Sequence, residues 1–583
     1  MNNIVKYLGI LFVSGILTAS TVFFFYPIRN ASPLYSILAF ILIAAVTFVY
    51  FKWRPFLRSS SIESAKYNKW VLTVEALFSV FLLFSVKGEQ IFLADNSLVI
   101  VALVYLFTFL FIFMLVNVVI TSLLNIEFNT YQRDRSSFVR FLVYFIPVLG
   151  AMLIYWIAFF PAAMTPDSLA QWEQAHTRDF NDWHPIVFTW TIMLLTFIWD
   201  SPGIVSLFQM ISMSVVFAYM MLQFERIGVK RIFLYSVTLL FMILPVTGIF
   251  PLIIWKDILF SAFVLLFSTH VFNIVYTKGE WLKGPWSMAG FLLSSFGLVF
   301  FRHNGFPVFI IVGLCLLIVY RKHIKYLLPA YVGIIALHFV ITGPVFNALD
   351  VEPSDPNEAL SLPTQQIALI VSEDGEMTEE QRNYVNDILP IQMWKDKYNP
   401  YLVDPIKFSW EDYDRELIFD DFGRYVKNWL ALWWQNPALG FEAFFDQTSL
   451  VWQINQPEDG YTDSYVTNIY YGNPQGLVDK VIHPAVTSAA GQYLQQTKDT
   501  FGFIIWRPAV YFSLIALFSM VVIIRNGFRY VLVSLPVLLN ILAVMAALPA
   551  QDFRYLFSNT LITFLLFVMI FINDKKTEGV LDE

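Results

Sequence analysis

Residues 98–124 read LVIVALVYLFTFLFIFMLVNVVITSLL, an apolar run without a single charged side chain. An α-helix rises about 1.5 Å per residue, so about 20 such residues cross the roughly 30 Å hydrocarbon core of a bilayer. Comparable runs recur along most of the chain, at residues 8–25, 33–51, 141–160, 204–222, 258–276 and 556–572. This repetition predicts an all-α polytopic membrane protein.

The composition of the 583-residue chain excludes a soluble enzyme. Hydrophobic residues make up 57% and aromatic residues 18%, and the mean hydropathy is +0.62, far above the values of globular domains. The single cysteine, Cys315, lies in an apolar run, which excludes an intrachain disulfide and argues against thiol catalysis. The sequence has no long Lys/Arg tract, so nucleic acid is not an expected partner.

Basic residues mark the connections that we assign to the cytoplasm, since Lys and Arg are enriched there. This assignment places both termini inside the cell membrane and residues 343–505 outside. Three apolar segments lie between two of the basic clusters, although the number of crossings there must be even. The shortest, residues 186–199, is therefore interpreted as a half-span or re-entrant helix, which gives about 14 transmembrane helices. The clusters lie at residues 52–69, 133–140, 226–231 and 321–325.

Four parts are expected along the chain. Residues 343–502 hold 25 acidic and nine basic residues, together with six tryptophans and several Asn-Pro turns. This composition predicts an ordered, mainly helical extracytoplasmic domain rather than a linker. The parts are N-terminal transmembrane helices (1–140), a catalytic transmembrane core with an outer loop at 161–185 (141–342), the extracytoplasmic domain (343–505), and C-terminal transmembrane helices with a short cytoplasmic tail (506–583).

The loop TPDSLAQWEQAHTRDFNDWHP, residues 165–185, carries an unusual number of ionisable groups at a membrane edge. Thr165 and Pro166 are also typical of a helix start, with Asp167 in the first turn, where it complements the helix dipole. Asp167 is a candidate general base. Asp182 and His184 are candidates for orienting a substrate hydroxyl or for helping to bind a divalent cation, although His184 also suits a helix cap.

Three further polar islands adjoin apolar runs on the same side of the membrane. They are Trp255-Lys256-Asp257, Arg302-His303-Asn304-Gly305 and Gln551-Asp552-Phe553-Arg554-Tyr555. Basic residues are scarce on this side, so we expect an anionic ligand beside them, and arginine suits phosphate because its planar fork donates two hydrogen bonds at once. The plainer alternative is local neutralisation, of Lys256 by Asp257 and of Arg554 by Asp552.

The ordered set TPDSLAQW, WHP, WKD, RHNG, LPTQQIA (362–368) and DFRY resembles the GT-C superfamily of membrane glycosyltransferases. It looks most like an uncharacterised family of large bacterial multi-spanning membrane proteins in that superfamily. The resemblance covers roughly residues 140–560 and implies sugar transfer from a polyprenyl-phosphate donor, with membrane lipid and a glycan or protein acceptor as the other partners.

By this resemblance Asp167 acts as the base on the acceptor hydroxyl. The superfamily's paired-acid signature is absent, because Ser168 follows Asp167, so the metal is unknown. The resemblance implies no certain cofactor. A divalent cation (Mg²⁺ or Mn²⁺), if one is used, would be bound by Asp167 and Asp257. The substrate-binding residues implied are Asp182, His184, Lys256, Asp257, Arg302, His303, Gln365, Gln366, Arg554 and Tyr555.

Two other functions stay open at the level of sequence. A lipid-linked polysaccharide polymerase or ligase would share the many spans, the large outer segment and the outer arginines. A transporter or flippase would place its binding groups near the bilayer midplane, often within repeated halves. The ionisable residues of this chain gather at one face instead, which favours the transferase.

Overall fold

The computed structural model describes residues 2–25, 33–52, 69–86, 97–126 and 138–574. Within these ranges every regular element is helical, and β-pairing is limited to four isolated bridges. Residues Leu98–Leu124 form one continuous helix, α5, and the side chain of Ser97 accepts a hydrogen bond from the N–H of Ile100 at its start. The prediction of a polytopic helical membrane protein is confirmed.

Nine helices in the described ranges are long and apolar enough to cross a bilayer. A tenth is obtained if α10 (Arg231–Ile243) and the following Pro245–Leu252, bent by 71° against it, are counted as one broken span. Four shorter apolar helices accompany them. One is α8 (Ile186–Thr196), whose 11 residues extend about 16 Å, half of a hydrocarbon core. The interpretation of residues 186–199 as a half-span or re-entrant helix stays a prediction.

The other helices outside residues 356–447 have these bounds: α1 Asn2–Phe25, α2 Pro33–Lys52, α4 Lys69–Ser85, α6 Phe138–Ala158, α7 Pro166–Thr177, α9 Pro202–Arg226, α11 Pro245–Ile249, α12 Lys256–Tyr276, α13 Pro285–Phe300, α14 Gly305–Val319, α15 Ile324–Val340, α16 Phe346–Ala348, α24 Ser449–Trp452, α25 Pro484–Ile505, α26 Pro508–Asn526, α27 Val531–Ala547 and α28 Phe557–Met569. Short 3-10 turns lie at Phe250–Leu252, Glu280–Lys283, Arg321–His323, Phe528–Tyr530 and Phe553–Leu556, and a π-helical turn at Ile341–Val345 joins α15 to α16.

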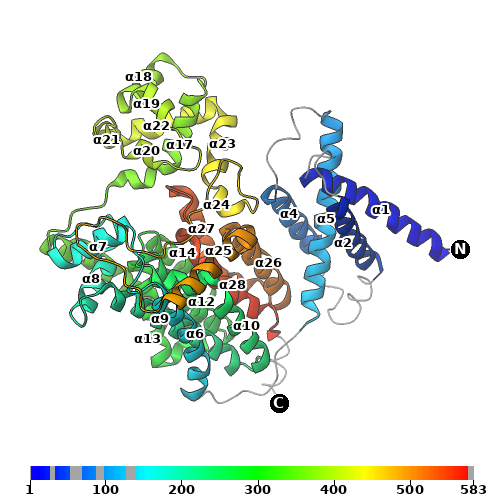
Figure 1. Cartoon of the computed structure of the whole chain (residues 1–583), viewed down its shortest axis with the longest axis horizontal. Helices are drawn as coiled ribbons and strands as arrows, with labels where there is room; N and C mark the ends of the chain where they lie inside the picture. Colours follow the sequence, from blue (N-terminus) through cyan, green and yellow to red (C-terminus); the bar gives the residue numbers. More distant parts are fainter. Residues whose placement is uncertain (1, 26–32, 53–68, 87–96, 127–137, 575–583) are drawn as a thin grey trace.

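Helix α12 is the centre of the membrane part. It is almost entirely buried and packs against α9, α13, α27 and α28. Helices α1, α2, α4 and α5 form a separate group beside this body, on the right in Figure 1, and α4 and α5 touch it through α26. Much of the surface of α2 is apolar and exposed, as expected for a helix that faces lipid.

A second hydrophobic core belongs to the segment Pro356–Gln447, which we call the helical domain and which lies at the top in Figure 1. Its elements are a 3-10 turn at Pro356–Leu360, α17 Ser361–Ser372, α18 Glu379–Ile388, α19 Ile391–Lys397, α20 Asp404–Lys407, α21 Arg415–Asp420, α22 Phe422–Gln435 and α23 Pro437–Gln447. The separate core is thus smaller than the expected 343–505 domain. Residues 448–505 lie on the membrane part instead, because Leu450, Val451, Ile469 and Leu494 are buried in that core.

The helical domain is fixed to the loop between α27 and α28. The N–H of Val403 donates to the carbonyl oxygen of Pro549 over 3.0 Å. The amide of Gln447 donates to the carbonyl oxygen of Leu548 over 2.6 Å, and the amide of Gln551 donates back to Gln447 over 2.7 Å. This loop leads directly to Arg554, so the domain helps to position one of the predicted site residues.

Candidate active site

A cavity of about 320 Å³ lies where the membrane helices meet the helical domain. Most of the residues that the sequence singled out are gathered here, although they come from four separate stretches of the chain. The predicted residues that line it are Asp167, His184, Lys256, Arg302, His303, Arg554 and Tyr555. Asp257 adjoins this set through an ion pair with Arg302, and Asp182 adjoins it through its contacts with His303.

Asp167 enters the cavity from the first turn of α7. Pro166 begins this helix, and the side-chain oxygen of Ser168 accepts a hydrogen bond from the N–H of Thr165 over 3.1 Å. The hydroxyl of Thr165 in turn accepts the indole N–H of Trp255 over 3.0 Å. The helix-start interpretation of this motif is confirmed, and the same geometry places Asp167 at the cavity, where its role as a site residue stays a prediction.

Arg554 is held between two carboxylates. Its Nη1 lies 2.8 Å from Oδ2 of Asp167, and its Nε lies 2.8 Å from Oδ2 of Asp552. The backbone N–H of Arg554 also donates to Asp552 over 3.0 Å, and the guanidinium lies 5.0 Å from the ring centre of Trp255. Neutralisation by Asp552 therefore occurs as the sequence suggested, and Asp167 adds a second carboxylate to the pair.

Lys256 and His184 form a second pair, with Nζ 2.6 Å from Nδ1 of the imidazole. Burial, followed by the nearby Lys256 charge, lowers the pKa of His184 to about 3, so the ring is neutral at physiological pH. Because an ammonium group can only donate, Nδ1 accepts and the ring proton resides on Nε2. That nitrogen lies 3.8 Å from Oδ1 of Asp167.

The carboxyl of Asp167 is a weak base in this setting. Burial raises its pKa, but the positive charges of Arg554 and Lys256 and the hydrogen bond from Arg554 outweigh that effect. The pKa of Asp167 consequently lies well below its usual range, because nearby cations favour the ionised form. Asp167 remains an anion throughout the physiological pH range.

Arg302 pairs with Asp257 rather than with a neighbour in sequence. Its Nη1 lies 3.1 Å from Oδ1 of Asp257, whose side chain is 1% exposed, and it donates to the carbonyl oxygen of Tyr555 over 3.0 Å. Lys256 and Asp257 therefore each bind a partner on another element. The cations of the cavity are organised across helices, which the local charge-pair alternative did not predict.

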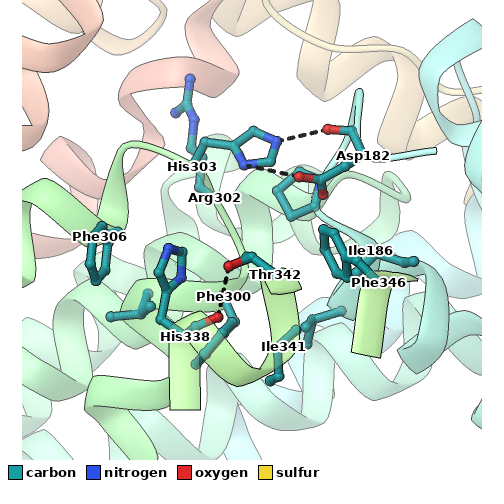
Figure 2. A pocket seen from close by; sticks show the side chains of 13 residues that line it. Asp182, Ile186, Phe300, Arg302, His303, Phe306, His338, Ile341, Thr342 and Phe346 are labelled. Atoms are coloured by element: carbon teal, nitrogen blue, oxygen red, sulfur yellow. Dashed lines mark hydrogen bonds and ion pairs between the residues drawn. The ribbon is translucent and has the colours of Figure 1, made fainter. Parts of the chain in front are cut away.

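A second cavity of about 320 Å³ adjoins the first and shares Arg302 and His303 with it. Apart from its polar end its walls are largely apolar, and Figure 2 shows the Arg302 side chain pointing away from them. Nε2 of His303 donates to the carbonyl oxygen of Asp182 over 3.1 Å. Burial raises the pKa of Asp182 to about 6. The apolar lining includes Ile186, Phe300, Phe306, Ile341 and Phe346.

Gln365 and Gln366 do not line either cavity. The amide of Gln365 donates to the carbonyl oxygen of Asn399 over 2.7 Å. Gln366 accepts the indole N–H of Trp429 and donates to the carbonyl oxygen of Gly440, both over 2.8 Å. The expectation that these residues bind substrate is therefore not supported by their positions, since both amides hold α17 inside the helical domain.

The cavity also contains residues that sequence reasoning missed. Asp404 and Glu358 reach it from the helical domain, and Trp183, Asn304 and Phe408 also line it. Glu358 pairs with Lys407 over 2.8 Å. No local signal marks Asp404, Glu358 and Phe408, because they meet the cavity only through the docking of the helical domain. Trp183 and Asn304 lie within the polar islands of the sequence, although they were not among the predicted site residues.

The carboxylates do not form a metal site. Asp167 and Asp257, the expected ligands, are each engaged by an arginine. Across the part of the chain that the structure describes, no group of three or more His, Cys, Asp or Glu side chains is suited to hold a metal ion. Bound Mg²⁺ or Mn²⁺ commonly needs several oxygen ligands in one place, so the residues present do not fit such an ion.

The fold and the cavity define a polytopic helical membrane protein with a charged chamber beneath a helical domain. The chain belongs to a family of unknown function, DUF6020, whose model matches residues 28–581. No curated protein and no solved structure matches it.

Proposed function

We propose that this protein is a GT-C-type glycosyltransferase of the cell membrane that transfers a sugar from a polyprenyl-phosphate donor. The acceptor is a polymer, lipid or protein of the cell envelope. In this proposal the chain crosses the membrane about 14 times with both termini in the cytoplasm. The helical domain and the cavity then face the outside.

One observation carries the proposal: the charged cavity and the apolar cavity meet at Arg302 and His303. The chemical groups of a polyprenyl-phosphate sugar follow the same order as the two cavities. A polar sugar is joined to an anionic phosphate, which is joined to a hydrocarbon chain. With the phosphate at Arg302, the sugar fits the charged cavity and the chain fits the apolar one. Arginine and lysine side chains are the usual phosphate ligands.

The arrangement suits transfer to an acceptor better than hydrolysis. A departing polyprenyl phosphate is already a good leaving group, so the site must chiefly stabilise its charge. Lys256, Arg302 and Arg554 supply preorganised cations, and such donors usually provide the largest share of catalysis. Glycoside hydrolysis usually requires a carboxylic acid and a carboxylate acting as a pair.

We expect Asp167→Asn to reduce transfer by at least about 10²-fold, while membrane insertion stays intact. The change removes the anion that holds Arg554 and faces His184, and with it any proton acceptance by this residue. The measurement is transfer of radiolabel from a panel of polyprenyl-phosphate sugars by purified protein.

Asp179→Asn is the matched control, because Asp179 lies exposed in the same loop and does not line the cavity. Wild-type rates in Asp167→Asn would remove this residue from the mechanism. A wild-type protein that uses no donor but binds a soluble solute saturably would favour the transporter instead.

Removal of divalent cations is expected to leave transfer unchanged. Asp167 and Asp257, the carboxylates expected to hold a metal, are each paired with an arginine, and these cations take the charge-stabilising role of a metal. The check is the initial rate with EDTA against the rate with added Mg²⁺ or Mn²⁺. A loss of activity with EDTA that a metal restores would contradict this expectation.

A further inference from the structure

Asp404 supplies a carboxylate to the charged cavity from the helical domain. It begins α20 and lines the same space as Asp167, Lys256 and Arg554. The other carboxylate that the domain contributes is Glu358. The two carboxylates differ in the hydrogen bonds and ion pairs that they form with the surrounding protein.

Helix α20 is fixed over the cavity from two directions. On one side, the N–H of Val403 donates to Pro549, in the loop that leads to Arg554. On the other side, the ring of Phe408 lies 6.1 Å from the ring of Trp183, the neighbour of His184. Asp404 is therefore held between the loop that leads to Arg554 and the loop that carries His184.

The Asp404 carboxylate differs from the neighbouring carboxylates in its interactions. Asp167 is bound by Arg554, and Glu358 is bound by Lys407. Asp257 and Asp552, behind the cavity wall, are likewise paired with arginines. Across the described ranges, no hydrogen bond or ion pair engages the carboxylate of Asp404. It is thus available to a hydroxyl group that enters the cavity.

We propose that Asp404 is the general base that deprotonates the acceptor hydroxyl, an inference that rests on the transferase function proposed above. The acceptor oxygen forms a bond to the anomeric carbon of the sugar as the bond from that carbon to the phosphate oxygen breaks. The electron pair of the broken bond leaves with the polyprenyl phosphate. The acceptor proton passes to the Asp404 carboxylate and from there to water.

In this division of roles Asp167 is a positioning residue that holds the guanidinium of Arg554. Burial raises the pKa of Asp404 to about 6, with Glu358 and Asp167 acting in the same direction and Lys407 and Arg554 acting against it. A base works best when its pKa is close to the operating pH. Burial raises the pKa of Asp167, but Arg554 and Lys256 hold it well below its usual range. Asp167 is therefore the poorer proton acceptor.

The first test compares Asp404→Asn and Asp404→Glu with wild-type protein in lipid nanodiscs. Asp404→Asn is expected to lower kcat by about 10²–10⁴-fold with the donor KM unchanged, since a base acts in the transition state. Asp404→Glu should recover part of the rate. Asp387→Asn is the matched control, because Asp387 is exposed on α18 and lies away from the cavity.

The pH profile separates a base from a structural residue. The wild-type rate should fall as the pH drops below about 6, because the Asp404 carboxyl becomes protonated. The residual activity of Asp404→Asn should lack this limb. Asp182 and Asp552 also have pKa values raised by burial to about 6, so a limb that persists in the variant belongs to them and overturns the assignment. Besides Asp404, the ionisable side chains that line the cavity are Asp167, His184, Lys256, Arg302, His303, Glu358, Arg554 and Tyr555.

A second readout does not depend on turnover. Dicyclohexylcarbodiimide modifies protonated carboxyls in apolar surroundings, and mass spectrometry locates the adduct. Modification of Asp404 should fade as the pH rises through about 6, and farnesyl phosphate should block it. Labelling without protection would show that Asp404 is not beside the ligand, which overturns the proposal.

The failure of this inference is distinguishable from failure of the transferase. Active wild-type protein with an equally active Asp404→Asn variant refutes the base and leaves the transferase standing. An inactive wild-type protein with every donor refutes the transferase and the base together. In that case, protection of Asp404 by farnesyl phosphate would still locate an anion-binding cavity.

Discussion

Arg554→Met is expected to lower sugar transfer by about 10³-fold at saturating donor. Arg554 binds Asp167 and Asp552 at 2.8 Å each, so its loss removes a cation and leaves two carboxylates beside the cavity without their shared partner. The negative charge on the leaving phosphate would then develop against this acidic surface. The effect should therefore exceed the loss of one hydrogen bond.

The same substitution should raise the pKa of Asp167. The Arg554 charge is the largest of the effects that lower it, and only burial, which acts in the opposite direction, is larger. Arg382→Met, on an exposed face of α18, is the matched control for loss of one positive charge. In Arg554→Ala, added guanidinium should restore part of the rate. Transfer by Arg554→Met at the wild-type rate would exclude a direct role for this side chain.

Arg302→Met is expected to destabilise the protein by about 3–5 kcal/mol, in addition to weakening donor use. The Asp257 side chain is 1% exposed and lies 3.1 Å from Arg302, so the substitution leaves a buried carboxylate without its partner. Removing one member of a buried ion pair is costly because the remaining charge stays out of water. Thermal unfolding in detergent measures the loss.

A second substitution distinguishes the structural role of this pair from its functional role. Arg302→Met combined with Asp257→Leu should recover most of the stability, since apolar side chains replace a buried ion pair at little cost. Transfer should stay low in the double variant, because the phosphate still lacks Arg302. Recovery of transfer together with stability would show that Arg302 serves the fold alone.

The helical class followed from the sequence because bilayer dimensions restrict what an apolar run can form. The run at residues 98–124 became α5 with the same bounds. The number of membrane crossings is harder to predict from the sequence. Short segments such as α8, and bent pairs such as α10 with the helix that follows it, are as apolar as a full span but do not have the length of a straight crossing. Their paths depend on packing, which composition does not encode.

The membrane-edge charges were also recognisable from sequence, because an ionisable group beside an apolar run is costly without a purpose. Seven of the singled-out residues line one cavity. Their pairing was not predictable, since Lys256 turns to His184 and Asp257 to Arg302, across helices distant in sequence. Gln365 was predicted to bind substrate but does not line the cavity, whereas Asp404 was not predicted and does line it. Docking of the helical domain decides which of its side chains meet the cavity.

The contact between the helical domain and the loop at residues 548–551 limits how the sequence of this protein can diverge. Val403 and Gln447 of the domain donate hydrogen bonds to this loop, and Gln551 of the loop donates one to Gln447. A domain with its own core is ordinarily a module that evolution can exchange, enlarge or delete. Here the attachment surface is also the scaffold of Arg554. Insertions among relatives should therefore accumulate around α18 and α19, on the far side of the domain (Figure 1), while α20 and the end of α23 keep their length.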